Sequence, residues 1–401
     1  MKPIERPFYT QRILPYFGKG LVLVLTGQRR VGKRFLLKQL RERVEADAGS
    51  HVIYINKEQS DFWGITNHSD LSAYVSEHLQ SGKRNYLFID EVQEIEGFER
   101  CIRSLQADDA CEIVLTGSNA KMLSSELSTL LAGRYIEFHL QSLDYAEFLR
   151  FHNLADSDET LALYLDIGGL PQLFRIGKDN REMIEEYLDN VYNTIILKDV
   201  IARENIRNVG FLNNLTAFLS DNVGKQVSAT SISKYMKSEQ VSITTNAVLN
   251  FLNYLCNAYI VARVPRYDIH GKRLLESNAK YYFEDIGLRN HIAGFRRVGD
   301  IEKIIENAVF LHLRRQGYKV FVGQYNQFEF DFVAEKPGIT KYFQVSYMLS
   351  GEDVIAREFG NLLKIRDHHP KFVVTLDKFQ AATNYEGIGV VHLRDFLLSE
   401  P

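Results

Sequence analysis

The sequence predicts an α/β fold: a parallel sheet covered by helices, then a helical segment, a winged helix and a small further α/β domain. Three observations indicate this. Between residues 21 and 140, short aliphatic runs alternate with longer amphipathic stretches, the rhythm of strand and helix repeats. A glycine-rich loop directly follows the first aliphatic run. After Gln141 the apolar residues recur at steps of three and four, which is typical of helices.

The expected N-terminal sheet has five strands, because nearly unbroken apolar runs are typical of strands buried on both faces. These runs are 22–26, 51–56, 86–90, 112–116 and 135–140. The predicted division of the chain is a sheet domain over 1–140, a helical lid or linker over 141–210, a winged helix-turn-helix over 211–285 and a further α/β domain over 286–401.

The parts after the first domain are predicted from their element order. Gly168, Gly169 and Pro171 interrupt the helical segment and mark a turn. The winged helix is expected to have helices over 228–236 and 244–258 and strands over 260–264 and 279–283, around a turn at 270–272. The last domain is expected to have helices over 301–316 and 354–367 and strands over 319–322, 328–334, 342–347, 372–376 and 390–393.

Composition excludes several classes of protein. A chain of 401 residues with 45% hydrophobic content can bury sizeable cores. Its formal net charge of -3 does not favour a basic nucleic-acid coat or a binder of membrane surfaces. Cys101, Cys111 and Cys256 lack the spacing of metal ligands or disulfides, so buried thiols in a reducing cytoplasm are expected. Neither a signal peptide nor a membrane span is apparent, so we expect a cytoplasmic protein with no membrane partner.

The glycine-rich loop has the pattern and the setting of a P-loop, the Walker A motif. It reads Gly27-Gln28-Arg29-Arg30-Val31-Gly32-Lys33 and lies between a strand and an amphipathic helix. Its glycines let backbone N–H groups turn toward phosphates, and Lys33 adds a point charge at the helix N-terminus. The next position needs Ser or Thr to hold Mg²⁺ but is Arg34. Mg²⁺ would then rely on water and a second motif, or the guanidinium would replace part of its charge.

That second motif is an apolar strand ending in Asp90 and Glu91, a Walker B pattern. Asp90 is expected beside Mg²⁺, and Glu91 is expected to polarise the water that attacks the γ-phosphate. An Asp-Glu pair after a strand is also a common helix cap, and only its pairing with the P-loop favours the catalytic interpretation.

Two further positions are candidates for catalysis. Asn119 closes the run Leu115-Thr116-Gly117-Ser118-Asn119, which ends a strand in small polar residues that could hold water or the γ-phosphate. Arg134 is expected to close a helix before the last strand, where it could reach the γ-phosphate of a neighbouring subunit in a homo-oligomer. An ordinary arginine at a helix C-terminus explains Arg134 equally well.

With these motifs placed, the chain resembles prokaryotic AAA+-type ATPases whose P-loop module is joined to a C-terminal domain of unknown function, a winged helix plus a restriction-endonuclease-like core. The matching segments are 26–33, 88–93, 115–119, 131–134, 168–171 and 329–332. The resemblance implies ATP and Mg²⁺ as cofactors, Lys33 on the phosphates, Asp90 and Glu91 as the Walker B pair, Ser118 or Asn119 as first sensor and Arg134 as the finger. Asn56 matches the place where related ATPases hold the catalytic glutamate inactive.

The nuclease-like core is expected to be degenerate. Such a core needs acidic or amide metal ligands and a lysine two residues after the second ligand. Glu306, Asp331 and Gln344 align with the ligands, but Ser346 occupies the lysine position. Asp331 is equally well explained as a half-exposed strand residue.

The sequence therefore predicts an ATP-binding protein, either an Mg²⁺-assisted ATPase or a nucleotide-dependent switch that couples ATP state to a protein partner or DNA through its C-terminal region. A nucleotide-gated, transcription-linked DNA-binding protein is one alternative, and a non-hydrolysing ATP-sensing scaffold, which Arg34 would permit, is another. The residues that would contact DNA are Thr244, Thr245, Asn246 and Asn250 on the second helix and Arg263, Arg266, Lys272 and Arg273 on the wing.

Overall fold

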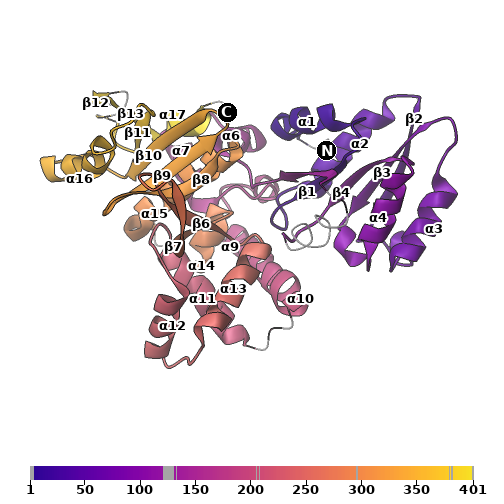
Figure 1. Cartoon of the computed structure of the whole chain (residues 1–401), viewed down its shortest axis with the longest axis horizontal. Helices are drawn as coiled ribbons and strands as arrows, with labels where there is room; N and C mark the ends of the chain where they lie inside the picture. Colours follow the sequence, from indigo (N-terminus) through magenta and orange to yellow (C-terminus); the bar gives the residue numbers. More distant parts are fainter. Residues whose placement is uncertain are drawn as a thin grey trace. The chain divides into compact units, whose positions relative to one another are not determined.

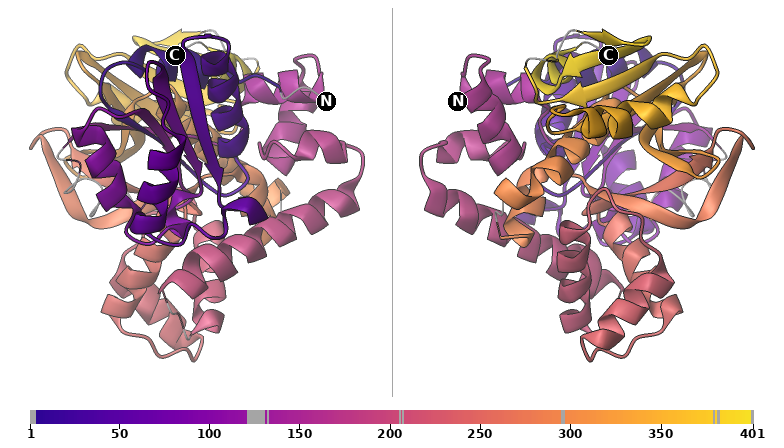
Figure 2. Two further views of the ribbon diagram at one scale, coloured as in Figure 1. Left: turned by 90° about the vertical axis from the view of Figure 1, so that its right-hand side faces the viewer. Right: turned by 90° about the vertical axis from the view of Figure 1, so that its left-hand side faces the viewer.

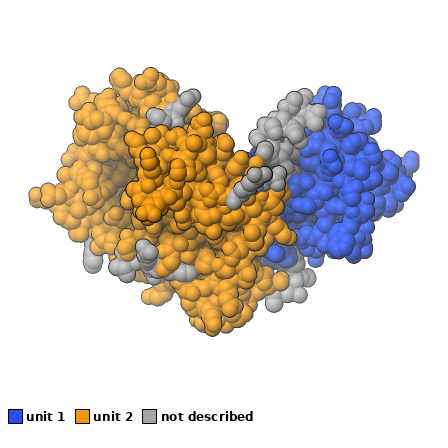
Figure 3. Space-filling model, turned by 90° about the horizontal axis from the view of Figure 1, so that it is seen from below, with its two compact units in different colours: residues 1–140, 257–259 blue, residues 141–256, 260–401 orange. Residues whose placement is uncertain are grey.

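The computed structural model describes residues 4–120, 131, 133–204, 206, 208–294, 297–378, 380 and 383–399. The chain divides into two compact units (Figure 3). The first comprises Met1–Leu140 and Asn257–Tyr259, and the second comprises Gln141–Cys256 and Ile260–Pro401. A short segment late in the sequence thus belongs to the first unit, while the residues on both sides of it belong to the second.

The first unit is built on a parallel sheet with strand order β2-β3-β4-β1-β5. All five strands confirm the predicted ones to within two residues at each end; they are β1 Val22–Thr26, β2 Ser50–Asn56, β3 Arg84–Asp90, β4 Glu112–Thr116 and β5 Tyr135–His139. β1 is buried along its whole length, as expected of a strand covered on both faces.

Helices cover both faces of this sheet (Figure 1). Val22 and Val24 of β1 pack in a core with α3 His68–His78 and α4 Phe98–Ala107. Leu23 and Leu25 point to the opposite face because side chains alternate along a strand, and α1 Pro7–Ile13 and α2 Lys33–Glu45 lie there. The short helical turns are η1 Leu14–Tyr16, η2 Ser60–Phe62 and η3 Val92–Glu94.

The strand order brings the predicted motifs together. β4 lies between β1 and β3, and the three strands are parallel, so their carboxyl ends share one edge of the sheet. The P-loop follows β1, Asp90 ends β3, and Thr116 ends β4. This edge is where ligands bind in open α/β sheets.

The second unit begins with helices, as the periodicity after Gln141 predicts. They are α6 Tyr145–His152, α7 Asp158–Ile167, α8 Leu173–Ile176, α9 Arg181–Thr194, the π-helical η5 Ile195–Ile201, α10 Ala202–Glu204, α11 Val209–Asp221, α12 Ala229–Ser238 and α13 Thr245–Asn257. α11, α12 and α13 stand together at the bottom of Figures 1 and 2. Ring contacts of Phe211 with Phe251 and of Phe218 with Tyr235 hold the three together.

An eight-stranded sheet with the order β12-β13-β11-β10-β9-β8-β6-β7 forms the rest of this unit. Its strands are β6 Val261–Asp268, β7 Arg273–Phe283, β8 Lys319–Tyr325, β9 Phe328–Lys336, β10 Ile339–Ser346, β11 Lys371–Thr375, β12 Asn384–Tyr385 and β13 Ile388–His392. The helices are α14 Ile286–Ile292, α15 Arg297–Arg315, α16 Glu352–Leu363 and α17 Leu393–Leu398.

The predicted wing is part of this large sheet. The hairpin strands extend beyond the predicted 260–264 and 279–283, and Arg266, Tyr267 and Asp268 of β6 pair in parallel with β8. The sheet therefore crosses the boundary predicted between residues 285 and 286. The register shift after Pro265 hides this continuation from the sequence pattern, because a bulge interrupts alternation.

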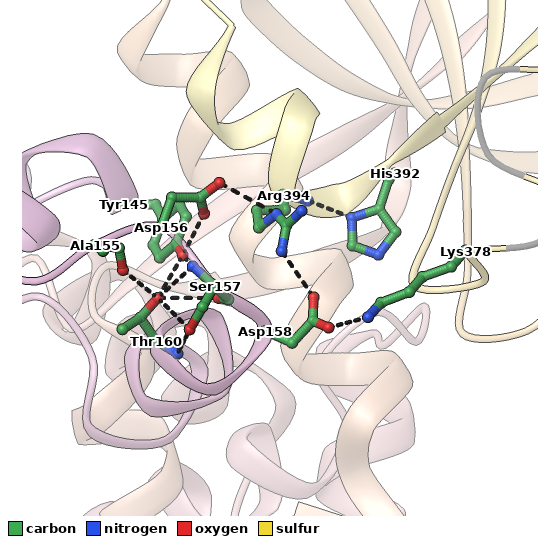
Figure 4. Close-up of polar contacts among 9 residues, drawn as sticks. All are labelled: Tyr145, Ala155, Asp156, Ser157, Asp158, Thr160, Lys378, His392 and Arg394. Carbon is green, nitrogen blue, oxygen red and sulfur yellow. Dashed lines mark hydrogen bonds and ion pairs between the residues drawn. The ribbon is translucent and has the colours of Figure 1, made fainter.

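Charged contacts join the start of α7 to α17 and to the loop after β11 (Figure 4). Asp158 lies between Arg394, whose Nη1 is 2.9 Å from its Oδ1, and Lys378, with which it forms an ion pair. Arg394 Nε also lies 3.3 Å from Asp156 Oδ2. These contacts explain why the helical segment and the last part of the chain form one compact unit.

The predicted turn at residues 168–171 follows α7. Gly168 has a φ of 76°, and a Cβ there would lie 2.3 Å from the backbone nitrogen of Gly287. The backbone N–H of Gly169 donates to Asp285 Oδ2 at 2.9 Å. Glycine is therefore needed at position 168 both for its conformation and for the close approach.

Two expectations from composition can be compared with the structure. Cys101 is buried, but Cys111 and Cys256 are only half-buried, so the prediction of three fully buried thiols was wrong; the apolar neighbours of a cysteine do not by themselves determine its depth. Among the described helices, none combines the length and the apolar character that a membrane span requires.

Candidate functional site

The loop between β1 and α2 depends on glycine at both ends. Gly27 has a φ of 133°, and a Cβ there would lie 2.1 Å from the carbonyl oxygen of Leu140. Gly32 has a φ of 99° and caps the N-terminus of α2. Both conformations strain any residue with a side chain, and Arg30 adopts one of them at a φ of 72°. The chain curls here because these positions permit it.

Hydrogen bonds of three side chains hold the loop in this curled conformation. Lys33 is buried, and its Nζ donates to the carbonyl oxygens of Gly27 at 2.8 Å and Gln28 at 3.0 Å. Arg6 Nη1 donates to the carbonyl of Val31 at 3.0 Å. Gln28 Nε2 donates to the carbonyl of Tyr259 at 2.9 Å. The Lys33 ammonium therefore lies within the loop, as anion binding there requires.

The two carboxylates predicted to be a Walker B pair lie at the end of β3. Asp90 is buried at the end of β3 and accepts a 2.6 Å hydrogen bond from Thr116 Oγ1. The same hydroxyl accepts from the Glu91 backbone N–H at 2.9 Å. Burial raises the pKa of Asp90 to about 6, which Thr116 partly counteracts. Thr116 thus bonds to both Asp90 and Glu91. Its position at the end of β4 could have suggested this role once the strand order was known.

Glu91 is held in an unusual conformation by polar neighbours. Its φ is 56°, a left-handed conformation that costs energy in residues other than glycine and is frequent at functional sites. Its carboxylate accepts from Gln93 Nε2 and, at 3.4 Å, from Ser118 Oγ. Ser118 and Asn119 are both buried at this edge. Gln93, which the sequence analysis placed in a matching segment without assigning it a role, is therefore a direct partner of the candidate base.

Asn56 lies beside this pair, opposite Asp90 in the sheet register. It is fully buried, and its Oδ1 accepts from the backbone N–H of Glu58 at 3.0 Å. Its Nδ2 has no hydrogen-bond partner among the described residues. The bonds to the Glu91 carboxylate come instead from Gln93 and Ser118.

Arg34 extends from the first turn of α2 toward the carboxylates. Its Nη1 lies 3.1 Å from Glu58 Oε2, and its Nε lies 4.0 Å from Asp90 Oδ2. The nearby Tyr54 hydroxyl has a pKa raised chiefly by burial and by the Asp90 carboxylate, an effect that the positive charge of Arg34 partly offsets. The side chain is half-exposed at 50% and borders a hollow of about 460 Å³ with Phe35, Lys38, Arg41, Tyr54 and Gln59.

This arrangement does not fit Mg²⁺ in its usual P-loop position. Mg²⁺ takes oxygen ligands in near-ideal octahedral geometry, and position 34 offers nitrogen donors that carry a positive charge. Asp90 is the remaining protein ligand of the predicted set, and its two oxygens face Thr116 and Arg34. A divalent cation beside the guanidinium would be repelled.

Arg134 lies at the other edge of the sheet. It is exposed, and it directly precedes β5, whose first residue Tyr135 is in register with Val22 at the start of β1. The P-loop follows the far end of β1, so a strand length of roughly 17 Å separates the two edges. The helix predicted before Arg134 falls on residues 121–130 and 132, outside the described part of the chain. Within one subunit the predicted finger and the P-loop are not brought together.

The predicted nuclease-like residues cluster around a lysine that sequence reasoning missed. Lys280 Nζ, on β7, lies 3.0 Å from Glu306 Oε1, 3.3 Å from Glu329 Oε1 and 2.9 Å from Asp331 Oδ1. Gln344 Oε1 accepts from the Asp331 N–H at 3.3 Å. Ser346 is buried and donates to the Met348 carbonyl. The described residues contain no group of three or more His, Cys, Asp or Glu arranged to hold a metal ion.

The predicted DNA-contacting residues divide into two sets. Thr244, Asn246 and Asn250 are exposed at and along α13. On the hairpin, Arg266 hydrogen-bonds Gln324, and Arg273 Nε lies 3.7 Å from Asp268 Oδ2. Of these two arginines, only Arg273 has a carboxylate beside it, because Gln324 is a neutral acceptor.

Comparison with known proteins is informative across the whole chain. An uncharacterised protein of Haemophilus influenzae is 33% identical over 402 aligned positions, covering 98% of each chain. This chain belongs to the same family. A second relative, from Methanocaldococcus jannaschii and also uncharacterised, is 29% identical over 78% of this chain and 71% of its own.

Family models and solved structures describe its parts. Residues 19–149 match the model of the AAA domain, and residues 158–298 match a domain of unknown function. A Walker-type ATPase of Pyrococcus abyssi has a similar fold, with a TM-score of 0.51 and 14% identity over 72% of this chain and 96% of the other. The chain therefore carries a P-loop ATPase domain of the AAA type.

Proposed function

We propose that this protein binds ATP through loop 27–34 and uses the nucleotide as a switch on its second unit, with slow hydrolysis assisted by Glu91. The observation that carries the proposal is the position of Lys33. Its ammonium is buried within the glycine-bounded loop, bonded to two carbonyl oxygens that phosphate oxygens would replace as its partners.

Hydrolysis would depend on the residues at the ends of β3 and β4. Glu91 would accept a proton from the attacking water, oriented by Gln93 and Ser118. Asn119 would contact the water or the γ-phosphate. Arg134 would act only on the site of a neighbouring subunit, because it lies at the opposite edge of its own sheet.

The segment Asn257–Tyr259 is the proposed route to the second unit. Gln28 of the P-loop holds the Tyr259 carbonyl, and the Ala120 N–H, which follows Asn119, donates to the Asn257 carbonyl at 2.9 Å. The segment continues directly from α13 and into β6. A shift of the P-loop or of the Asn119 region on ATP binding would therefore pull on both elements.

A non-hydrolysing ATP-sensing scaffold is the second candidate, and Arg34 favours it. Loss of the hydroxyl that holds Mg²⁺ removes the ion that usually stabilises the charge that develops in phosphoryl transfer. For either candidate, we propose a protein partner for the second unit in preference to DNA, since Arg266 and Arg273 of the hairpin already have partners.

ATP binding and phosphate release separate these candidates. We expect Lys33→Ala to abolish ATP binding, and Glu91→Gln to retain binding but lose any phosphate release. Phosphate release by the wild type that is lost in Glu91→Gln supports the switch with hydrolysis. Binding that requires Lys33 without phosphate release supports the scaffold, and equal binding by the wild type and Lys33→Ala contradicts both.

The proposed route is tested by hydrogen exchange. ATP is expected to change amide protection in residues 245–268 of the wild type but not of Gln28→Met, which keeps the shape of the side chain and loses its amide. Gln39→Met is the matched control, because Gln39 is another buried glutamine of the first unit that does not contact Tyr259. The same response in Gln28→Met as in the wild type would rule out this route.

A further inference from the structure

We propose that Arg34 replaces Mg²⁺ as the counter-ion of the nucleotide phosphates, so that this protein binds ATP without a divalent cation. The inference rests on the ATP binding proposed above and concerns how the same site neutralises its ligand. It also explains why the loop departs from the P-loop pattern at this one position.

The guanidinium is held where the counter-ion is needed. Arg34 directly follows Lys33 in the first turn of α2, and its side chain reaches Asp90, the carboxylate that supports the metal in ordinary P-loop sites. Glu58, just after β2, holds it with a contact of 3.1 Å between Arg34 Nη1 and Glu58 Oε2. An arginine with no role at the site would extend into solvent along the exposed face of α2, as Lys38 does toward Glu42.

The charge of the loop supports the same conclusion. Four of its eight residues are basic, namely Arg29, Arg30, Lys33 and Arg34. In an ordinary P-loop site the lysine and Mg²⁺ share the neutralisation of the outer phosphates. Here a fixed guanidinium accompanies Lys33, and its planar fork of N–H donors matches phosphate oxygens.

The replacement is incomplete in one respect. A guanidinium compensates charge and donates hydrogen bonds, but it cannot act as a Lewis acid that polarises a phosphoryl oxygen. Nucleotide affinity should therefore survive the change better than turnover. Bound ATP would therefore be hydrolysed slowly, and the occupancy of the site would follow the ATP concentration.

The test measures ATP affinity of the full chain by isothermal titration calorimetry, in Mg²⁺ and in EDTA. We expect the wild-type Kd to change by less than about threefold between the two buffers, and Arg34→Thr, which restores the usual residue, to bind about tenfold more weakly in EDTA than in Mg²⁺. Lys38→Thr is the matched control, an exposed cation one turn along the same helix, and is expected to behave like the wild type.

Three results would decide against the inference or against its premise. A wild-type protein that loses ATP binding in EDTA contradicts the counter-ion role of Arg34. So does an Arg34→Thr variant as indifferent to Mg²⁺ as the wild type. Absence of ATP binding by the wild type in both buffers would instead contradict the proposed function itself. Thermal unfolding of each variant confirms that the fold is retained.

Discussion

Each unit of this protein places a cationic side chain among carboxylates at a position where the sequence suggested a metal ion. In the first unit Arg34 faces Asp90 and Glu58, and its side chain is 50% exposed. In the second unit Lys280 faces Glu306, Glu329 and Asp331, and its side chain is 2% exposed. Both sites pair a cation with carboxylates, but the cation is half-exposed in the first unit and buried in the second.

The difference in burial distinguishes Arg34, whose contacts water can replace, from Lys280, whose contacts the fold requires. Burial opposes the charge of Lys280, but Asp331, Glu306 and Glu329 outweigh it and raise its pKa. Removing one member of such a buried group leaves charges that neither water nor protein compensates. Arg34 borders solvent, so water can replace its contacts. We infer that Lys280 holds the second unit together, whereas Arg34 can be exchanged without loss of the fold.

The largest expected effect tests the structural role of Lys280. Lys280→Met leaves three carboxylates without their cation and should lower the free energy of unfolding by about 3–5 kcal/mol, as breaking a buried ion pair does. Denaturant titration followed by circular dichroism measures it, with Lys319→Met, an exposed lysine of β8, as the control. An effect of Lys280→Met as small as that of Lys319→Met would mean that Lys280, like Arg34, is not needed for the fold.

The next prediction concerns the pH dependence of the first unit. Because burial raises the pKa of Asp90 from 3.8 to about 6, the folded state retains its proton over a range where the unfolded state has lost it. Stability should therefore fall as pH rises from about 4 to 6, by at most about 3 kcal/mol relative to Asp90→Asn, which cannot titrate. Parallel pH-dependent unfolding curves for the two proteins would show that Asp90 titrates normally.

A smaller effect is expected from the hydroxyl that joins the Walker B residues. Thr116→Val removes the bonds to Asp90 and to the Glu91 N–H at nearly constant volume, and should cost about 1–3 kcal/mol of stability. ATP affinity should change little, and any phosphate release should fall. Thr216→Val, which removes a buried hydroxyl bonded to Leu212 in the second unit, should lower stability without changing phosphate release. Equal phosphate release by Thr116→Val and the wild type would exclude a positioning role for Thr116.

The smallest expected effect on stability is that of replacing Arg34. Arg34→Met should change the free energy of unfolding by less than about 1 kcal/mol, because exposed ion pairs contribute little. The same denaturant titration that is used for Lys280→Met measures it. A loss as large as that of Lys280→Met would mean that Arg34 is a structural residue, and the proposed counter-ion role would lose its basis.

The comparison also indicates which parts of the fold and of the candidate site could be predicted from the sequence. The five strands of the first unit and the junctions around the P-loop follow from local patterns, because apolar runs, glycines and a terminal carboxylate pair are close together in the chain. Thr116 and Gln93 could be assigned their partners only after β4 was found between β1 and β3. Lys280 lies 51 residues before Asp331, and no spacing rule connects them.

The β6–β7 hairpin shows that strand pairing between distant parts of the chain was also not predictable from the sequence. Its two strands were predicted, but not the pairing of β6 with β8. The bulge after Pro265 breaks the alternation that would have extended β6 in the sequence. The hairpin of the predicted winged helix and the strands of the predicted last domain therefore belong to one sheet in the structure.

The sequence by itself determined the class of the first unit, the P-loop with its arginine at position 34, and the order of the strands in the first unit along the chain. These depend on residues adjacent in the chain, whose conformational preferences and spacing act locally. Only the tertiary structure decided which cation faces which carboxylate, and that Asn257–Tyr259 joins the nucleotide-binding unit. The reason is physical: burial and charge pairing act between atoms that are close in space, whatever their separation along the chain.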